Sequence, residues 1–478
     1  QDNPMNANDF FKLLKTSFPF TPTLKQDIGL QQLSNFVFSS VANELFVLKG
    51  YAGTGKTTII GVLVKNLWHA QKQAVLLAPT GRAAKVISNY SQKEAFTIHK
   101  KIYVPLSEKN GKMSFVLAPN KHKKTLFIVD EASMISDVSS QAKLFGSGAL
   151  LDDLIQYVYS GFQCKLLLIG DTAQLPPVKL DLSPALNESN LELNYNKEVL
   201  RLELDEVVRQ GEDSGILFNA TLLREAISNS YFESFEFNLK GFKDIVRLND
   251  GYEILDAIND AYSTLGNEDT ALIVRSNKRA NLYNEQIRSR ILFNENELTA
   301  GDFLMIVKNN YFWLKPTSEA GFIANGDIIE VLEVFNVKEL YGFRFAEVKI
   351  RMVDYPKMRP FETVLMLDTL KLETPSLPYE ESNKLYQEIL KDFEDEPSSY
   401  KKFLGVKKSK YLNSLQVKFS YAITCHKSQG GQWNTVFVEQ PYLPNGIDRD
   451  YLRWLYTAMT RAKEKLYLIG FKDDYFEL

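Results

Sequence analysis

A glycine-rich segment near the N-terminus has the residue types and the spacing that bind nucleotide phosphates. It reads GYAGTGKT, from Gly50 to Thr57, and stands between the apolar run LFVLK and the helix-like run TTIIGVLVKNLW. Backbone N–H groups of such a loop, together with the N-terminus of the helix that follows, cradle phosphates. We expect Lys56 to reach the β- and γ-phosphates and the Thr57 hydroxyl to ligate Mg²⁺. The segment therefore predicts a nucleoside triphosphate site.

Two further polar segments follow apolar runs and supply other groups that hydrolysis needs. TLFIVDEAS places Asp130 at the end of an expected strand, where a hard divalent cation prefers carboxylate oxygen. The adjacent Glu131 is suited to polarise the attacking water, and Gln174 in LLLIGDTAQLPPV to sense the γ-phosphate. Each segment alone is also compatible with a simple capped loop. Beside a phosphate-binding loop, the two together favour hydrolysis.

The sequence argues against two other classes of nucleotide-binding protein. A guanine-nucleotide switch requires an N-K-x-D loop, and the nearest match, SNKRA, has Ala280 in place of the aspartate. A kinase of one domain would leave the C-terminal half of the 478 residues without a role. A larger hydrolase fits the chain better.

Short apolar runs alternate with longer amphipathic segments along the chain. We expect buried strands where these runs begin, at Glu44, Ala74, Thr125 and Lys165 in a first set and at Thr270, Thr435 and Lys465 in a second. Strands separated by helices are typical of a parallel sheet with crossovers. From Gly301 to Arg351 the chain changes to β-branched and aromatic runs with Asn-Gly turns, which are typical of a small β-barrel.

These patterns predict an α/β fold with two parallel-sheet domains and an all-β domain inserted in the second. The first domain is expected to span residues 1–190, the second to combine 191–300 with 412–478, and the insertion to span 301–411. Residues 354–411 exceed what a compact barrel needs. Their acidic and basic halves suggest a helical excursion or an extended arm.

The composition of the chain indicates where in the cell the protein is expected and which partners it is expected to bind. Hydrophobic residues make up 45% and charged residues 24%, as in soluble globular proteins. No apolar run reaches the ~20 residues of a transmembrane helix, and the N-terminus lacks a signal-peptide pattern. Cys164 and Cys425 are too few for a disulfide framework, which suits a reducing, cytoplasmic location. The net charge of −3 argues mildly against nucleic acid, although Lys121–Lys124 and Lys401–Lys410 are basic.

The order of the motifs resembles that of superfamily 1 helicases, specifically the B branch of RecD-like and Dda-type enzymes. The resemblance covers nearly the whole chain and rests on the segments FTPTLKQDIGL, GYAGTGKTT, LLAPTGRAAKVIS, AFTIHK, VDEAS, GDTAQLPPV, ELDEVVRQ, YAITCHKSQG and LRWLYTAMTRAKEKLYLIG. It implies two RecA-like motor domains with ATP and Mg²⁺ in the cleft between them, and an SH3-like β-domain inserted in the second.

The resemblance also implies how the nucleotide site is shared. The second domain would bring two arginines to the phosphates, Arg209 and the arginine finger Arg461. The implied nucleotide-binding positions are Gln26, Gly50, Ala52, Gly53, Thr54, Gly55, Lys56, Thr57, Thr58 and Gln432. Gln432 departs from the family pattern, in which a glutamate often contacts the ribose, and its amide is a weaker acceptor.

A nucleic-acid strand is expected to cross both motor domains and the inserted β-domain. By resemblance, the strand-binding positions are Pro79, Thr80, Arg82, Thr97, His99, Asn309, Asn310, Tyr311, Thr424, His426 and Ser428. Short hydroxyls and amides suit phosphate contacts, which position a strand without reading its sequence. Phe312 and Trp313 are expected in the barrel core.

The segment YVPLSEKNGKMSFVLAP, from Tyr103 to Pro119, is typical of a β-hairpin. Asn110-Gly111 favours a type I′ turn, and Pro105 confines its strand to an edge. A two-stranded hairpin is barely stable alone, so we expect it to lean on a neighbour such as the inserted β-domain. B-branch relatives carry a small wedge at this point of the chain, which implies that the hairpin splits the duplex.

Together these features predict an ATP- and Mg²⁺-dependent DNA helicase that moves 5′→3′ on single strands. It would unwind forked duplexes as a monomer, in replication, repair or recombination. Two alternatives stay open: a strand-bound remodelling factor without processive unwinding, and the motor subunit of a multi-subunit nuclease complex. RNA also stays open as a substrate, because contacts to phosphate do not distinguish it from DNA.

Overall fold

The computed structural model describes residues 3–107, 113–139, 144–208 and 211–477. Its α-helices are α1 (Ala7–Ser17), α2 (Leu24–Phe38), α3 (Lys56–Asn66), α4 (Gly81–Ser91), α5 (Ile98–Ile102), α6 (Leu150–Tyr159), α7 (Glu188–Tyr195), α8 (Gly215–Ser228), α9 (Gly251–Leu265), α10 (Asn277–Gln286), α11 (Tyr379–Leu390), α12 (Ser399–Lys407), α13 (Cys425–Ser428) and α14 (Arg449–Met459). No helix of this part of the chain is long and apolar enough to cross a membrane.

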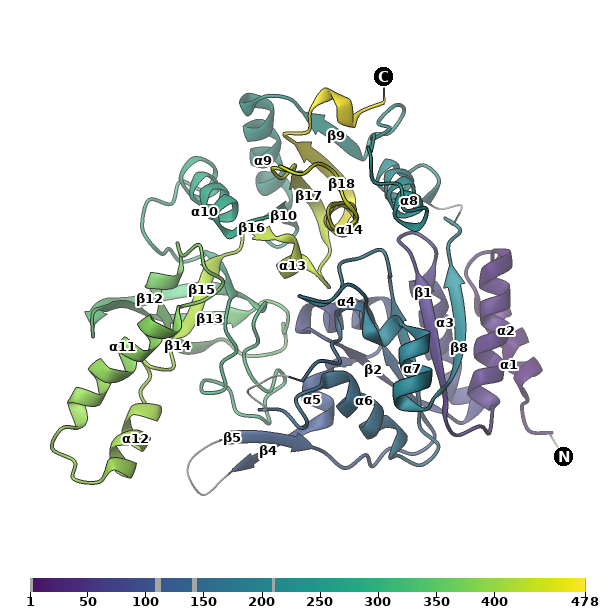
Figure 1. Ribbon diagram of the computed structural model, residues 1–478, viewed down its shortest axis with the longest axis horizontal. Helices are drawn as coiled ribbons and strands as arrows, with labels where there is room; N and C mark the ends of the chain where they lie inside the picture. Colours follow the sequence, from purple (N-terminus) through teal and green to yellow (C-terminus); the bar gives the residue numbers. More distant parts are fainter. Residues whose placement is uncertain (1–2, 108–112, 140–143, 209–210, 478) are drawn as a thin grey trace.

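The first sheet has six parallel strands in the order β3-β2-β6-β7-β1-β8 (Figure 1). They are β1 (Glu44–Gly50), β2 (Gln73–Ala78), β3 (Ala95–Thr97), β6 (Thr125–Val129), β7 (Lys165–Gly170) and β8 (Glu198–Leu204). Side chains of β1 alternate between the two faces. Phe46 and Leu48 pack with α1, α2 and α3, whereas Leu45 and Val47 pack with α5 and α6. Burial on both faces explains the continuous apolar run in the sequence. This sheet and its helices are termed the first unit.

The second sheet has five parallel strands in the order β16-β10-β17-β18-β9. They are β9 (Ile245–Leu248), β10 (Thr270–Val274), β16 (Ala422–Thr424), β17 (Trp433–Glu439) and β18 (Ala462–Ile469). Leu272 and Val274 of β10 pack in the core that includes α9 and α10, and Ile273 packs with α8 and α14. This sheet and its helices are termed the second unit. All seven apolar runs expected to be strands are strands in the two sheets.

A closed barrel is inserted between β10 and β16 of the second unit. Its strands are β11 (Phe303–Ile306), β12 (Ile328–Leu340), β13 (Phe343–Met352), β14 (Phe361–Met366) and β15 (Leu415–Phe419). The two parallel sheets and the barrel confirm the predicted fold class.

Two expected boundaries are wrong by one strand each. β8 pairs with β1 in the first sheet, so the first unit continues beyond residue 190. Charged side chains interrupt β8, as is common for an edge strand, and they obscured its apolar pattern. β15 closes the barrel by pairing with β11 and β14, so the return to the second unit comes after residue 412.

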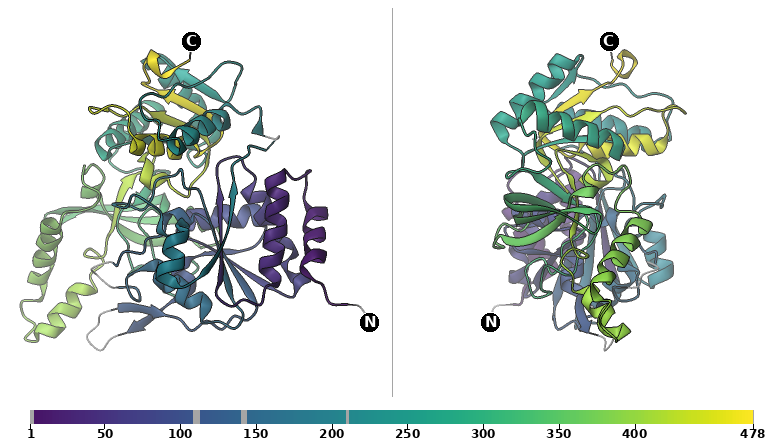
Figure 2. Two further views of the ribbon diagram at one scale, coloured as in Figure 1. Left: turned by 45° about the vertical axis from the view of Figure 1, so that its right-hand side comes forward. Right: turned by 90° about the vertical axis from the view of Figure 1, so that its left-hand side faces the viewer.

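An arm and a hairpin project from the molecule at the same end (Figures 1 and 2). The arm consists of α11 and α12, which pack through Leu385, Ile389 and Val406. The helical excursion expected between residues 354 and 411 is therefore present, although β14 within that range belongs to the barrel.

The hairpin pairs β4 (Tyr103–Ser107) with β5 (Met113–Leu117) in antiparallel register. The predicted Asn110-Gly111 turn lies outside the described residues. Phe115 stacks on Phe145 with ring centroids 4.6 Å apart, and lies 5.7 Å from Tyr311 in the barrel insertion. The hairpin thus leans on the inserted β-domain, as expected.

Candidate nucleotide and strand-binding sites

The loop that joins β1 to α3 requires glycine at two positions. Gly53 and Gly55 have φ angles of +74° and +84°, which glycine adopts without strain. A Cβ atom on Gly55 would also lie 2.2 Å from the amide nitrogen of Gln26. Gln26 Nε2 donates to the Thr54 carbonyl (3.5 Å), and its Oε1 accepts from Thr23 N (2.9 Å). Gln26 therefore lies against the loop, and its role in reading adenine stays a prediction.

Lys56 begins α3 and faces carboxylates at the ends of β6 and β7. Burial lowers the pKa of Lys56, but attraction by Asp130, Glu131 and Asp171 outweighs burial, so the pKa is raised. The ammonium group therefore stays charged and able to bind phosphate oxygens. Burial and the neighbouring Asp130 charge raise the pKa of Glu131, which suits a group that accepts a proton from water.

Asp130 and Thr57 offer the oxygen ligands that Mg²⁺ prefers. The Asp130 carboxylate accepts from Tyr90 Oη (2.6 Å) and from Glu131 N (2.8 Å), which fixes its direction. Thr57 is exposed and lines the same cavity as Tyr90. Among the described residues, no group of three His, Cys, Asp or Glu could hold a metal. Mg²⁺ at nucleotide sites commonly takes its further ligands from phosphates and water.

Arg461 comes to this site from the second unit. It follows α14, is 3% exposed, and donates from Nε to the Thr457 carbonyl (2.9 Å) and from Nη1 to the Gly431 carbonyl (3.1 Å). Its charge acts to lower the pKa values of both Lys56 and Glu131, so it lies close to them. Arg209, the other predicted arginine, lies outside the described residues.

Helix α14 also holds the loop of residues 171–181 in the first unit, which the sequence did not predict. The Arg453 side chain is 3% exposed and donates to the carbonyls of Thr172 (3.2 Å), Gln174 (2.7 Å) and Asp181 (2.8 Å). Backbone carbonyls have no sequence signature. An arginine within the otherwise apolar run LRWLY was the one available signal for this contact.

Tyr456 makes a second link from α14 to the nucleotide loop. Its hydroxyl accepts from Ala52 N (3.0 Å) and donates to the Asp171 carboxylate. The Ala52 N–H, a predicted phosphate donor, is therefore used by the second unit in this arrangement. Gln174 is 4% exposed and its Oε1 has no hydrogen-bond partner in the described part of the chain. Such an unused buried acceptor fits a site that is completed by a bound nucleotide and its water.

Three of the predicted strand contacts are threonines at the starts of helices. Thr80 Oγ1 accepts from Ala83 N (3.1 Å) at α4, and Thr97 Oγ1 accepts from Lys100 N (3.1 Å) at α5. Thr424 precedes α13 in the second unit. Capping accounts for threonine at the first two positions without any ligand. It also leaves their hydroxyl protons able to donate to a phosphate.

Ser428 is placed differently from the prediction, and His99 lies in an aromatic cluster. Ser428 is fully buried and donates to the Cys425 carbonyl (2.6 Å), so it cannot contact a strand. Burial lowers the pKa of His99 to about 4, and its ring packs 4.8 Å from Phe145 and 5.5 Å from Tyr103. The ring thus packs in an aromatic cluster, and because His99 is half-buried its contact with a strand stays a prediction. His426, in contrast, is exposed at α13.

The predicted strand contacts of the barrel insertion shape their own loop. Asn310 Nδ2 donates to the Asn413 carbonyl (2.8 Å), and its Oδ1 accepts from Phe312 N (3.0 Å). Asn309 is exposed, but its Oδ1 accepts from Asn325 N (2.7 Å). Tyr311 packs on the base of the hairpin. Phe312 is 40% exposed, so its expected place in the core is wrong, whereas Trp313 packs against the barrel core.

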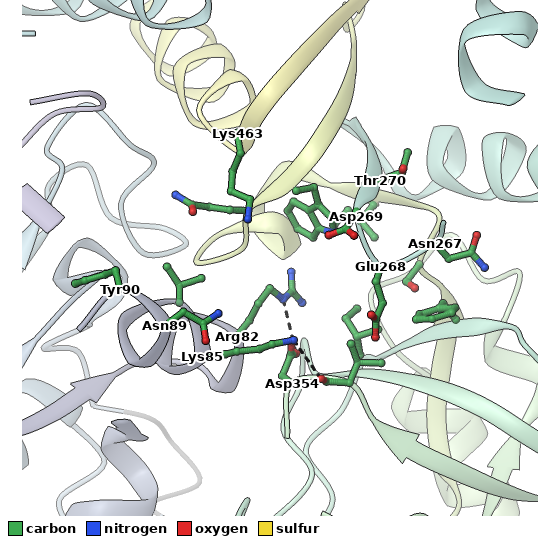
Figure 3. Close-up of a pocket in the computed structure, with 18 of the residues that line it drawn as sticks. Arg82, Lys85, Asn89, Tyr90, Asn267, Glu268, Asp269, Thr270, Asp354 and Lys463 are labelled. Carbon is green, nitrogen blue, oxygen red and sulfur yellow. Dashed lines mark hydrogen bonds and ion pairs between the residues drawn. The ribbon is translucent and has the colours of Figure 1, made fainter. Parts of the chain in front are cut away.

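A cavity of about 600 Å³ lies between the two units and the barrel. Figure 3 shows Lys463 entering it from β18, opposite Arg82 and Asp354. Exposed Gln432 lines this cavity together with Thr57. Gln432 and Thr57 therefore line one cavity, and the contact of Gln432 with the ribose stays a prediction.

Comparisons with known proteins match both sides of the nucleotide site. A model of AAA domains matches residues 34–180, and a model of UvrD-like helicase C-terminal domains matches residues 419–469. The ATP-dependent DNA helicase dda of Enterobacteria phage T4 is 25% identical over 475 residues, which cover 92% of this chain and 98% of dda. The chain belongs to the B branch of superfamily 1 helicases. The matched ranges contain Lys56 and Asp130 in one and Arg461 in the other, so this helicase carries both parts of the site within them.

Two further relatives of this helicase differ in how far the likeness extends. The uncharacterized protein R530 of Acanthamoeba polyphaga mimivirus is 23% identical over 508 residues, covering 92% of this chain and 98% of R530. The ATP-dependent RecD2 DNA helicase of Deinococcus radiodurans is 33% identical over 156 residues, covering 32% of this chain and 19% of RecD2. The match to RecD2 is therefore restricted to a small part of that protein.

Proposed function

We propose that this helicase hydrolyses ATP with Mg²⁺ and uses the energy to move 5′→3′ along single-stranded DNA and to unwind the duplex ahead of it. The observation that carries the proposal is the division of the nucleotide site between two units. Lys56 and Glu131 belong to the first unit, whereas Arg461 reaches them from the second.

The divided site links hydrolysis to movement. Lys56 attracts the phosphates, and Glu131 orients and deprotonates the attacking water. Mg²⁺ held by Thr57 and Asp130 would neutralise charge on the β- and γ-phosphates. Arg461 stabilises the transferred phosphoryl group only while the two units are closed. Closing on ATP and opening after hydrolysis would therefore move one unit relative to the other.

The strand would pass over the helix starts at Thr80, Thr97 and Thr424. These positions come from both units, so a change in their separation would shift the bound strand. Hydroxyl contacts to phosphate read no bases, so binding would be independent of sequence and weakened by salt.

The hairpin is proposed to part the two strands. Val104, Leu106 and Val116 leave apolar side chains 41%, 48% and 38% exposed on it. Exposed apolar groups on a short edge are costly in water, and they suit contact with unstacked bases. Phe145 in the first unit and Tyr311 in the barrel contact the base of the hairpin. Movement of the units along the strand would therefore press the exposed face of the hairpin against the duplex.

A forked-duplex assay tests the proposal directly. Substrates carry a single-stranded tail on either the 5′ or the 3′ side, in DNA and in RNA. We expect ATP- and Mg²⁺-dependent unwinding of 5′-tailed DNA, and none by Lys56→Ala. Unwinding from 3′ tails alone would reverse the proposed direction. DNA-stimulated hydrolysis without any unwinding would favour the remodelling factor.

A further inference from the structure

Arg82 lies where the first unit, the second unit and the barrel meet. It is in the first turn of α4, two residues after Thr80. The sequence predicts a strand contact for Arg82, which would require guanidinium donors that are available to a phosphate. Figure 3 instead shows the side chain within the cavity between the units, linked to Asp354.

One side of the guanidinium group is bound to the barrel. Arg82 Nη2 donates to the Gly326 carbonyl at 2.5 Å, and Nε lies 3.9 Å from Asp354 Oδ2. The Arg82 and Asp354 side chains are only 11% and 7% exposed. Gly326 has a φ of +99°, which suits glycine at the turn before β12.

The other side of the guanidinium group is bound to the second unit. Arg82 Nη1 donates to the Lys427 carbonyl in α13 at 3.1 Å, and the group lies 5.4 Å from the Trp433 ring. A Cβ atom on Gly431 would lie 2.7 Å from Arg82 Cδ, so a glycine at this position makes room for the side chain. The guanidinium group donates to these two carbonyls from two separate nitrogens, Nη1 and Nη2, whereas a lysine would have to reach both from a single ammonium nitrogen.

We propose that Arg82 is a positioning residue that ties α4 to both the barrel and α13. It sets the distance between Thr80 in the first unit and Thr424 in the second, and so the spacing of the strand-facing helix starts. This inference rests on the proposed function for its role in strand movement. Its geometric part, the link between the units, does not depend on that function.

The test compares Arg82→Gln and Arg82→Lys with Lys85→Gln. Lys85 lies one turn later in α4, lines the same cavity, and makes one longer hydrogen bond, to the Val353 carbonyl at 3.4 Å, while its charge also acts on Asp354 without joining α4 to the second unit. We expect Arg82→Gln to lower the kcat of DNA-stimulated ATP hydrolysis by about tenfold, within the usual range of coupling between sites. The KM for ATP should stay near the parent value. Arg82→Lys should not restore kcat, and Lys85→Gln should match the parent.

The salt dependence of single-stranded DNA binding separates a link from a phosphate contact. If Arg82 is a link, the slope of log K against log salt in Arg82→Gln equals that of the parent. A slope reduced by about 0.7, the value for one phosphate contact on a single strand, together with rescue by Arg82→Lys, would overturn the proposal.

Energy transfer between dyes tests the link without any ligand. The dyes are attached at Trp68→Cys in the first unit and Tyr442→Cys in the second, which are 68% and 86% exposed, while both native cysteines are buried. Arg82→Gln should change the transfer efficiency and Lys85→Gln should not. Unchanged efficiency in Arg82→Gln would contradict the link. If single-stranded DNA does not change the transfer efficiency of the dye-labelled parent, that result would instead contradict the proposed function.

Discussion

The nucleotide site and the junction around Arg82 are both polar, and both are shared between units, yet only the junction joins its units through one side chain that donates to both neighbours. At the nucleotide site, Thr57 is exposed and Gln174 Oε1 has no hydrogen-bond partner in the described part of the chain. At the junction, Arg82 donates from Nη1 and Nη2 to the carbonyls of Lys427 and Gly326, while its Nε and Asp354 Oδ2 lie 3.9 Å apart without a hydrogen bond. Buried polar groups are normally paired. The paired donors of Arg82 therefore mark where the units are held, whereas the Gln174 acceptor at the nucleotide site is available to a ligand.

The largest expected effect is at the nucleotide site. Lys56→Ala removes the charge that binds the β- and γ-phosphates, so ATP hydrolysis should fall to background. Lys49→Ala is a matched control, because Lys49 precedes the same loop but pairs with Glu188 at 2.9 Å. Its hydrolysis should stay near the parent rate. Parent-like hydrolysis by Lys56→Ala, measured as phosphate release, would mean that this loop does not bind the nucleotide.

A smaller effect is expected where α14 holds the loop of residues 171–181. Arg453→Gln leaves carbonyls of that loop without their donor, so Gln174 is less well placed and DNA-stimulated kcat should fall about tenfold. Arg449→Gln on the same helix is the control, because Arg449 is exposed and the hydrogen bonds to that loop's carbonyls come from Arg453. Equal hydrolysis rates for Arg453→Gln and Arg449→Gln would show that the hydrogen bonds from Arg453 have no part in hydrolysis.

The hairpin should affect unwinding but not hydrolysis. The triple variant Val104→Ser, Leu106→Ser and Val116→Ser makes its exposed face polar, so unwinding of a 5′-tailed fork should slow several-fold. DNA-stimulated ATP hydrolysis should be unchanged, because β4 and β5 project from the side of the first unit that lies away from the second unit (Figure 1). Leu193→Ser is the control, since Leu193 is 82% exposed on α7. An unwinding rate equal to that of the parent would exclude the hairpin as the wedge.

The smallest expected effect is the contribution of His99 to the pH dependence of the protein's stability. Burial lowers the pKa of His99 to about 4 from the ordinary 6.5. Between these values the unfolded chain binds a proton that the folded chain does not. The contribution of His99 to the free energy of unfolding is therefore fully present above pH 6.5. It is lost as the pH falls toward 4.

His99→Phe removes this pH dependence while keeping an aromatic ring in the cluster. We expect the Tm of the parent, relative to that of His99→Phe, to decrease as the pH is lowered from about 7 to about 5. Thermal unfolding at several pH values measures this difference. A Tm difference that is constant over this range would show that His99 is not held neutral by burial.

The nucleotide loop could be predicted from the sequence because its geometry is local. Gly53, Gly55 and Lys56 lie within one turn between a strand and a helix, and the strand's apolar pattern is visible on both sides. Seven strands of the two sheets and the presence of a barrel followed from runs of the same kind, whereas the order of the strands did not. β8 was missed because an edge strand is only half buried and carries charged residues.

The junction could not be predicted because its contacts join segments that are distant in the chain. Arg82 meets Gly326 and Lys427 through their carbonyls, and a carbonyl is present in every residue. Ser428 has the residue type of a phosphate contact, but the short helix α13 turns it inward. The motif alone does not distinguish a side chain that faces a strand from one that holds the unit next to it.

The most direct test of the central claim, that two units complete one nucleotide site, is hydrolysis by Arg461→Ala in saturating single-stranded DNA. Nucleotide binding is measured in parallel with a fluorescent ATP analogue. The account predicts that binding is largely kept while kcat falls on the order of 10³-fold, as expected when an arginine finger is removed. Hydrolysis at the parent rate, with binding intact, would contradict the claim that the second unit acts on the phosphates.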